Sequence, residues 1–573
     1  MLHEGYHPSD DELDLEPLGD DDEADDDDVF LDDDEDETAA LLGGPPPAAM
    51  LGLRATPSTP FLPVAARPVK APSISLLGLA TLAFFSVSGG PFGIEVALAA
   101  GGPARTVQAL LTLTLLSALP SAMMTAELSS ALPGRAGAVY WVERGLSPLM
   151  GALTAWVSLL NTAVDASAYP GVCVDYILFG IRRWCGWTPS STDGWLRTCS
   201  AVVLTTVVCV LNLRGIVAAT RASVFLAVFS IAPFALMFAL SLLTPGLSMA
   251  RATGALAASS DEPAADWPLM LSVCLWSASG YDSVSFVSSE VRDSGDERAT
   301  VLPRAMRLSV LAMLLTTLLP ILASCAAAGD RVRVGAVLLA ATNGSVSGDG
   351  GGGGALWVAP IGEWHNWTLG SFAAPAETLG GQPLGVWTCV AAVASSLGLL
   401  NAYLCTSARN VQAMAQRGWL PSSLKGERSA DTTPTPALVF SAVSILLLCA
   451  FTFSELVELN MALYCTSLAL EMLALLRLRW SEPQLHRPYA IPLGRSALVV
   501  AFLPQLALCV VIIWFTIRRP AGGALWVLVI LSGLALPRMS HRLGSVCQQR
   551  SDARRWSAPG SRDRDYGLGR WQR

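Results

Sequence analysis

Two short stretches rich in glycine or serine interrupt long apolar runs of this sequence. The first is Ser86–Glu95 (SVSGGPFGIE), and the second is Ser277–Ser283 (SASGYDS). Glycine and proline disfavour a continuous helix, so each run should unwind there and leave backbone N–H and C=O groups free. In a membrane, such groups are tolerated where they line a cavity or contact protein. Breaks at corresponding positions of two repeats therefore predict a binding site for a small molecule, with simple packing kinks as the alternative.

Acidic residues within the apolar runs are the second chemical signal. Each one costs several kcal/mol at the centre of a bilayer unless it is paired or hydrated. No basic residue lies deep among them, so a cavity lined by these acids suits a cationic substrate, a proton, or both. The acids concerned are Glu95, Glu127, Asp165, Asp282, Glu290 and Glu471.

Several of these acids also have a structural interpretation. Glu95 follows Pro91 in the first turn of a half-helix, where a carboxylate offsets the helix dipole. Asp165 and Asp282 are the hardest to explain structurally. Three further acids lie near predicted cytosolic ends, where an arginine is available to each: Glu127 with Arg135, Glu290 with Arg292, and Glu471 with Arg477.

The position of Glu95 separates two classes of substrate. Carriers of amino acids with broken helices bind the substrate carboxylate at the N-terminal ends of those helices. Glu95 places a negative charge at one such end, which favours a diamine or polyamine, while a cationic amino acid stays open. Nearby aromatic side chains would add cation–π contacts of about 0.5–2 kcal/mol each, unless they serve only in helix packing. They are Phe92, Tyr169, Trp276 and Tyr281.

The elements that position these residues are membrane-spanning helices. Of 573 residues, 52% are hydrophobic and only 15% are charged, and the apolar residues form blocks of about 20, the length that crosses a bilayer. The sequence predicts an all-α membrane protein with about twelve transmembrane helices. The runs lie near 74–99, 106–130, 148–178, 199–214, 220–243, 268–288, 308–328, 385–408, 435–453, 456–476, 497–516 and 522–537.

The charge distribution predicts the domain organisation and the orientation. Residues 1–70 read as a disordered acidic cytosolic tail, 71–540 as the transporter domain, and 541–573 as a basic cytosolic tail. With the N-terminus inside, cytosolic segments hold 28 of the 37 Lys and Arg residues, as the positive-inside rule requires. The segment 329–384 is then an extracellular loop. It carries two glycosylation sequons, at Asn343 and Asn366, which support this orientation.

Other classes of function leave no trace in the sequence. There is no CxxC pair or zinc spacing, and none of the five histidines lies in an apolar run, so no metal or cofactor is expected and proton transfer would use carboxylates. We find no P-loop, GxSxG or HExxH motif, so an enzyme is not expected.

The ordered set of motifs resembles the amino acid–polyamine–organocation (APC) superfamily. The likeness is greatest to the polyamine-uptake transporters of plants and kinetoplastids, which are related to the L-type amino acid transporters. It extends over nearly all of residues 74–516. It rests on Ser88–Glu95 (SGGPFGIE), Thr125–Leu128 (TAEL), Tyr140–Val142, Val164–Tyr176, Trp276 with Tyr281–Ser283, Glu290–Val291, Met414–Pro421, Leu463–Cys465, Leu470–Glu471 and Arg487–Gly494 (RPYAIPLG).

This resemblance implies a leucine-transporter-like fold, an inverted repeat of five plus five helices with two extra, in which helices 1 and 6 unwind at mid-membrane. It implies proton-coupled uptake of polyamines by alternating access. The implied substrate-binding residues are Gly89, Gly90, Phe92, Glu95, Asp165, Tyr169, Trp276, Tyr281, Asp282 and Tyr403. The proton-coupling candidates are Glu95, Asp165, Asp282, Glu290 and Glu471.

Some positions depart from the family pattern, so three hypotheses stay open. Many plant members carry Asn where this chain has Ser277 and Ser279, and an acid where it has Tyr403. The first hypothesis is a polyamine–proton carrier in the plasma membrane, with an intracellular membrane as the alternative. The second is a permease or exchanger of cationic or neutral amino acids. The third is a transporter-like nutrient receptor that signals through its acidic tail. Lipid and small cations are the expected partners, and nucleic acid is not.

Overall fold

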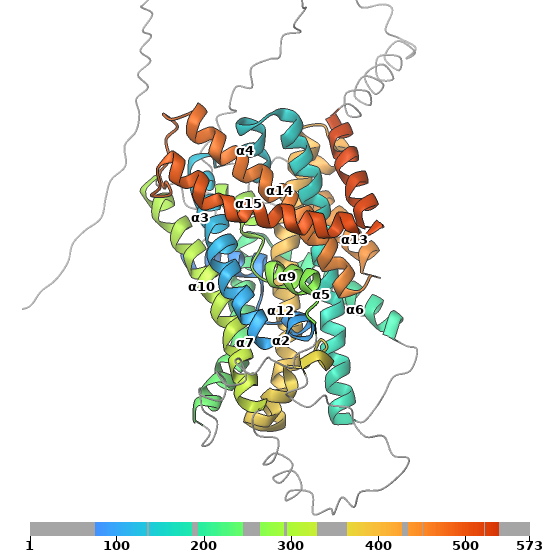
Figure 1. Ribbon diagram of the computed structural model, residues 1–573. Helices are drawn as coiled ribbons and strands as arrows, with labels where there is room; N and C mark the ends of the chain where they lie inside the picture. Colours follow the sequence, from blue (N-terminus) through green and yellow to red (C-terminus); the bar gives the residue numbers. More distant parts are fainter. Residues whose placement is uncertain are drawn as a thin grey trace, which may run out of the picture. The chain divides into compact units, whose positions relative to one another are not determined.

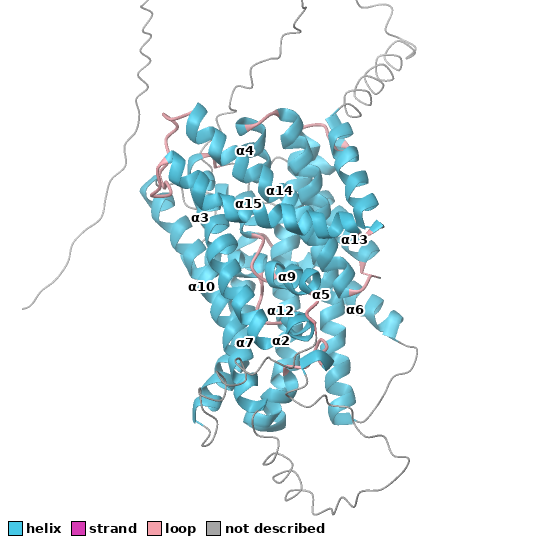
Figure 2. Cartoon of the chain, in the orientation of Figure 1, coloured by secondary structure: helices cyan, strands magenta, loops and turns pink. Residues whose placement is uncertain are grey.

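The computed structural model describes residues 75–133, 137–185, 193–243, 264–290, 295–328, 364–426, 434–449, 451–520 and 522–537. All of them belong to one compact unit, Arg67–Arg573. The predicted tails, 1–70 and 541–573, lie outside the described residues, as does the sequon at Asn343. Throughout the described part the regular elements are helices, and Figure 2 shows no strand there.

Every predicted apolar run contains helix in its described part. Seven helices are long and apolar enough to cross a membrane, and four shorter apolar helices accompany them. One of the seven, Ile94–Ala131, contains a non-helical residue, Gly102, followed by Pro103, so it joins the end of the first predicted span to the second. With the broken sixth span, these helices account for the twelve predicted runs.

The first span consists of two half-helices. α1 (Leu76–Val87) is capped by Ser75, whose hydroxyl accepts a hydrogen bond from the Gly78 N–H at 3.1 Å. α2 (Ile94–Leu113) begins after Gly93. Between them the backbone takes positive φ at Gly89, Gly90 and Gly93, angles that residues with a side chain rarely adopt. The predicted break is therefore present, because the glycines permit a path that a helix cannot follow.

The sixth span has a matching break. α9 (Trp267–Trp276) begins at the N-cap Asp266 and ends before Gly280, which has φ 104°. The chain continues as η3 (Tyr281–Glu290), a 3₁₀ helix. A 3₁₀ stretch of this length is uncommon and is typical of a hinge.

The remaining helices surround these two broken spans (Figure 1). After α2 come the π-helical turn η1 (Thr114–Ala118), α3 (Leu119–Ala131) and the short α4 (Gly137–Gly145). The further elements are α5 (Pro148–Cys185), α6 (Asp193–Leu213), α7 (Ile216–Leu243), α10 (Gly295–Ala328), η4 (Trp364–Asn366), α12 (Ala373–Gln416), η5 (Ser422–Lys425), α13 (Thr435–Leu448), α14 (Phe453–Ser481), α15 (Arg495–Arg518) and the apolar helix Gly522–Pro537.

Burial distinguishes central helices from peripheral ones. In α5 and α14 the most apolar window is 72% buried, whereas in α15 it is 28% buried. Figure 1 shows α15 crossing the front of the bundle, where large apolar side chains such as Val510 stay exposed. Exposed apolar surface on an outer helix suits contact with lipid, and α5 and α14 are placed to line the interior.

Two helices are longer than a bilayer requires. α5 has 38 residues and α12 has 44, with a kink in α12 at Gly381 and Pro383. At 1.5 Å per residue α5 is about 57 Å long, so it must tilt or extend beyond the hydrocarbon. α5 and α12 are the third and eighth spans, which occupy equivalent positions in the two halves of a five-plus-five repeat. The broken first and sixth spans are equivalent in the same way. The start of α12 also shows that the predicted loop 329–384 contains ordered helix after Trp364.

Candidate functional site

The two breaks contact each other at the centre of the described structure. Gly280 packs so tightly on the carbonyl oxygen of Ser86 that a Cβ atom would overlap it. The same Ser86 oxygen accepts a hydrogen bond from the Tyr403 hydroxyl of α12 at 3.0 Å. On the other side, the Ser395 hydroxyl donates to the Gly89 carbonyl at 2.8 Å. Free backbone groups of the first break are thus partly satisfied by α12.

Asp165 of α5 lies beside this junction, with 4% of its surface exposed. Its Oδ1 accepts hydrogen bonds from Trp276 Nε1 at 2.5 Å and from Asn460 Nδ2 at 2.8 Å. Its Oδ2 accepts one from the Tyr169 hydroxyl at 3.1 Å. These donors are all neutral, so they orient the carboxylate without compensating its charge. Buried charges in proteins are paired, so a bound cation would compensate the charge of this carboxylate.

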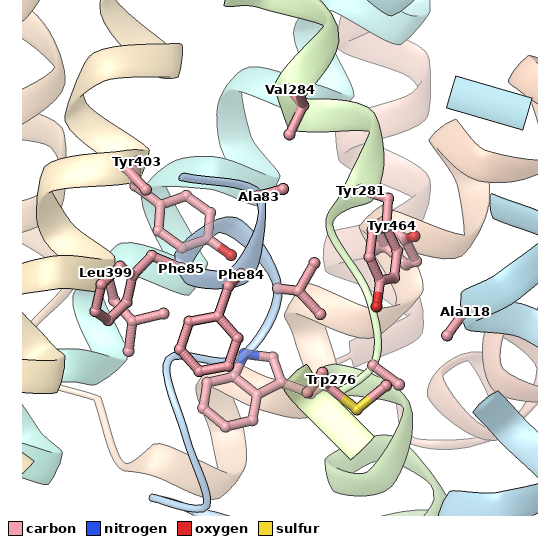
Figure 3. Close-up of a cluster of buried hydrophobic side chains, with 14 of the residues drawn as sticks. Ala83, Phe84, Phe85, Ala118, Trp276, Tyr281, Val284, Leu399, Tyr403 and Tyr464 are labelled. Atoms are coloured by element: carbon pink, nitrogen blue, oxygen red, sulfur yellow. The ribbon is translucent and has the colours of Figure 1, made fainter. Parts of the chain in front are cut away.

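Aromatic rings form the walls around Asp165. Tyr169 stacks on Tyr403, with ring centroids 5.6 Å apart, and lies 6.1 Å from Trp276. Phe453 at the start of α14 meets Trp276 edge-on at 5.3 Å. Figure 3 shows Trp276 on the sixth span and Tyr403 on α12, with Phe84 and Phe85 of α1 between them in that view. Rings next to a carboxylate are the surroundings that an organic ammonium group prefers.

Glu95 forms a separate centre at the start of α2. Its side chain is fully buried. One oxygen accepts a hydrogen bond from the Gly93 N–H at 2.8 Å, and the other accepts from the Gly370 N–H at 3.3 Å and from the Tyr176 hydroxyl. The carboxylate therefore joins α2, α5 and the segment before α12. As at Asp165, the donors are neutral.

Asp282 and Glu471 are two further buried acids, on η3 and α14. The exposed fraction is 8% for Asp282 and 0% for Glu471. Glu471 accepts a hydrogen bond from the Ser467 hydroxyl at 2.9 Å, so its expected pairing with Arg477 is wrong. One oxygen of each acid, Asp282 Oδ1 and Glu471 Oε2, has no hydrogen-bond partner among the described residues. Within the described helices, the structure thus surrounds the two breaks with four acids whose hydrogen-bond donors are uncharged.

Some predicted residues lie elsewhere. Phe92 packs edge-on against Tyr176 at 5.2 Å and against Phe234 at 5.3 Å, in an aromatic group next to Glu95. The Tyr281 hydroxyl is buried and has no partner within the described part. Gly90 has its carbonyl bonded by the Ser88 hydroxyl at 2.8 Å. The Glu290 side chain lies outside the described part of the chain. Asn366 is exposed in η4.

Two polar residues of these centres were not predicted from the sequence. Asn460 donates a hydrogen bond to Asp165. The feature of the sequence that could have identified Asn460 is a polar amide side chain within the apolar run 456–476. Tyr176 donates to Glu95 and lies eleven residues after Asp165, which places both on one face of α5. Helical spacing alone was therefore enough to find Tyr176 once Asp165 had been chosen.

Glu127 has a structural role in a different cluster. It is fully buried near the end of α3 and pairs with Arg479 at 2.5 Å and with Arg487 at 3.3 Å. The Ile491 N–H also donates to it at 2.9 Å. Its expected partner Arg135 lies outside the described residues. Glu127 therefore ties α3 to the segment between α14 and α15, at the end of the bundle predicted to be cytosolic.

We expect Glu127→Gln to lower stability far more than Glu482→Gln. Removing one partner of a buried ion pair costs about 3–5 kcal/mol. Glu482 pairs with Arg144 at 2.7 Å, but both side chains are about a third exposed, so losing that pair should cost less than about 1 kcal/mol. Thermal unfolding of the two variants in detergent measures the difference. Equal melting temperatures would contradict a structural role for Glu127.

Comparison with known proteins agrees with this architecture. The amino acid permease family profile matches residues 74–535. The chain is 32% identical over 446 residues to "Polyamine transporter PUT1" of Oryza sativa subsp. japonica, covering 78% of this chain and 74% of that protein.

Two further relatives show the breadth of the family. "Polyamine transporter RMV1" of Arabidopsis thaliana is 31% identical over 463 residues, 81% of this chain and 84% of its own. "Asc-type amino acid transporter 1" of Homo sapiens is 30% identical over 185 residues, 30% of this chain and 34% of its own. The profile spans most of the chain, and the first two relatives cover most of it at about 30% identity. The chain therefore belongs to the amino acid permease family of the APC superfamily, a family of membrane transporters with a fold of about twelve transmembrane helices.

Proposed function

We propose that this protein is a secondary active transporter that takes up polyamines, of the putrescine and spermidine class, together with protons. The observation that supports this proposal most strongly is the environment of Asp165. Its buried carboxylate accepts hydrogen bonds from three neutral donors and lies within aromatic walls. A carboxylate oriented this way offers its charge to a ligand. The polyamine transporters named among its relatives support the same class of substrate.

The proposed binding mode uses both the charge and the rings. One ammonium group of the substrate would meet Asp165 while Tyr169, Trp276 and Tyr403 contact its methylene chain and add cation–π attraction. A second ammonium group would face Asp282 across the break. The remaining members of the proposed site form its backbone and its outer wall: Gly89, Gly90, Phe92, Glu95 and Tyr281.

Alternating access would follow from the broken helices. The proposed site residues of the first, third, sixth and eighth spans are buried, so a substrate would reach them only after these helices move. Opening toward the outside would separate the Glu95 carboxylate from the Gly370 N–H that donates to it. We further propose that the protein resides in the plasma membrane. Both termini would lie in the cytosol, an orientation that the distribution of basic residues supports.

Transport of amino acids is the second candidate. It is favoured by the family profile and by the similarity to an amino acid transporter over part of the chain. Against it stands Glu95, whose carboxylate occupies the Gly93 N–H at the start of α2, where a substrate carboxylate would bind. We therefore favour a polyamine over an amino acid as the substrate.

A competition experiment distinguishes the two candidates. We expect unlabelled spermidine or putrescine in excess to abolish uptake of labelled putrescine, and leucine or arginine to leave it nearly unchanged. The reason is that a substrate carboxylate would be buried near Glu95 and Asp165 without a positive partner. Strong inhibition by arginine together with direct uptake of labelled arginine would overturn the polyamine assignment.

Coupling to protons has its own measurement. We expect putrescine accumulation to rise with external acidity and to collapse on addition of a protonophore. Among the described residues, the four buried acids around the two breaks have no basic partner, so they can carry protons inward. Replacing sodium by choline serves as the control and should change nothing. Dependence on sodium, with no response to pH, would rule out proton coupling.

A further inference from the structure

The side-chain amide of Asn460, on α14, is held in one orientation by Asp165. Asn460 is 2% exposed, and its Nδ2 donates a hydrogen bond to Asp165 Oδ1 at 2.8 Å. An amide turned the other way would direct its oxygen at the carboxylate, where neither group has a hydrogen to donate. The contact with Asp165 therefore determines which end of the amide is the oxygen. That oxygen, Oδ1, is buried and has no hydrogen-bond partner among the described residues.

The face of α14 that carries Asn460 lies against both breaks. Phe453 is seven residues before Asn460, so the two side chains share one face of the helix. The Phe453 ring meets Trp276 edge-on at 5.3 Å, and a Cβ atom on Gly93 would come within 2.9 Å of both rings. The first two turns of α14 therefore close one side of the amine site, although the tenth span was not expected to contribute to it.

The Asn460 oxygen lies close to the Asp165 carboxylate. The oxygen and nitrogen of one amide group are about 2.2 Å apart, given the lengths of its C=O and C–N bonds. Because Asn460 Nδ2 is 2.8 Å from Asp165 Oδ1, Asn460 Oδ1 is at most about 5 Å from that carboxylate oxygen. An ammonium nitrogen about 2.8 Å from each of two acceptors bridges a gap of about 4.6 Å at a tetrahedral angle, and of about 5.6 Å at most. One ammonium group can therefore contact both residues.

An ammonium group has three N–H donors, and Asp165 by itself cannot accept all of them. An ionised carboxylate offers about four acceptor positions. Three are occupied by hydrogen bonds from Trp276, Asn460 and Tyr169. The other N–H groups of a bound ammonium therefore need acceptors beside the carboxylate. The Asn460 oxygen is one, and the Tyr403 hydroxyl is another, because it donates its own hydrogen to a backbone carbonyl of the first break.

We propose that Asn460 is a further residue of the amine site and accepts a hydrogen bond from the ammonium group that meets Asp165. This inference rests on the proposed polyamine uptake and specifies the chemical form of the amine. A primary ammonium group can donate to the carboxylate, the Asn460 oxygen and the Tyr403 hydroxyl together. Each methyl group on the nitrogen removes one of these donors and leaves a buried acceptor unpaired. The site therefore selects primary amine ends against methylated ones.

The test compares putrescine with N,N,N′,N′-tetramethylputrescine on the purified full-length protein in detergent. Each end of the methylated compound keeps its positive charge but has one N–H in place of three. Displacement of labelled putrescine measures the affinity of each compound. In the wild type we expect putrescine to bind about 5-fold to 100-fold more tightly, because an unpaired buried acceptor weakens binding by about that factor.

Asn460→Leu and Asn460→Ala are the test variants. Both remove the acceptor, so the preference for putrescine should narrow by about fivefold or more. Both also remove the donor to Asp165, but that loss affects the two compounds alike and leaves their ratio unchanged. Leucine occupies more space than asparagine and alanine occupies less. A narrowing in both variants therefore reports the lost acceptor and not a change in bulk.

Asn212→Leu is the matched control. Asn212 is also a buried amide, on α6, and its Nδ2 donates to Asn401 Oδ1 at 2.9 Å, which is not a contact of the proposed amine site. This variant should keep the wild-type preference for putrescine even where its melting temperature falls. It thus separates a general loss of stability from a change at the amine site.

Each outcome decides the question. A narrowed preference in both Asn460 variants, with Asn212→Leu unchanged, supports the inference. Equal weakening of both compounds would show that Asn460 acts only through Asp165, and would overturn the inference while leaving polyamine binding intact. A narrowing in one Asn460 variant alone, or also in Asn212→Leu, would overturn it as an effect of bulk or of stability. Wild-type preference in the Asn460 variants, or a wild type that binds the two compounds equally, would overturn it too. A wild type that binds neither compound would refute the proposed function, and the inference with it.

Discussion

Replacing Asp165 by asparagine should abolish concentrative putrescine uptake. The charge of Asp165 is buried and opposed by neutral donors alone, so a bound ammonium group would be its one compensating partner among the described contacts. Truncating one member of a buried charge pair costs about 2–5 kcal/mol. At about 1.4 kcal/mol per tenfold change, affinity should fall by about 30-fold to several thousandfold. Putrescine binding to the purified variant, followed by its effect on melting temperature, measures the loss.

The fold should survive this substitution. An amide oxygen still accepts hydrogen bonds from Trp276 and Asn460, and the amide nitrogen can donate to the Tyr169 hydroxyl. The same change at Asp266 is the matched control, because Asp266 caps α9 at an exposed position and asparagine caps a helix equally well. Unchanged putrescine affinity in Asp165→Asn would remove Asp165 from the binding site, and with it the main support for a cationic substrate.

Replacing Gly280 by alanine should stop transport and destabilise the protein. Gly280 has φ 104°, and a Cβ atom there would overlap the Ser86 carbonyl oxygen. Backbone strain of about 1–2 kcal/mol and overpacking of about 1–3 kcal/mol together predict a loss of about 2–5 kcal/mol. Because Tyr403 also donates to Ser86, any shift of that oxygen displaces a wall of the amine site.

The Gly418→Ala variant distinguishes the effect of backbone strain from the effect of a steric overlap. Gly418 has φ 78°, also positive, but nothing lies within 4 Å of its virtual Cβ position. This variant should lose only about 1–2 kcal/mol from strain and keep its transport activity. Melting temperature and putrescine uptake of both variants are the measurements. Wild-type uptake in Gly280→Ala would show that the two breaks need not stay in contact during the cycle.

Much of the architecture was predictable because its signals are local. Apolar runs of about 20 residues determine where a chain can cross a bilayer, and Gly89, Gly90 and Gly280 require backbone angles that a helix cannot supply. The order of motifs identified the superfamily, which the profile match over residues 74–535 confirms. The expected pairing of Glu471 with Arg477 failed, because spacing along one helix does not reveal which side of it faces the protein interior.

The grouping of the acids was not predictable from spacing. Glu95, Asp165 and Asp282 were predicted to line one cavity, but their hydrogen-bond partners could not be predicted. Glu95 accepts hydrogen bonds from Tyr176 and Gly370, whereas Asp165 accepts them from Trp276 and Asn460.

What the sequence by itself determined is therefore the set of spans, the two breaks and the kinds of side chain that face them, since these depend on hydropathy and on backbone freedom along a few consecutive residues. Only the tertiary structure decided which acid meets which partner. Asp165 and Asn460 are 295 residues apart in the chain, and their contact depends on how α5 and α14 pack around the broken spans. Packing of this kind sums many weak contacts across the whole bundle, and no short stretch of sequence contains that information.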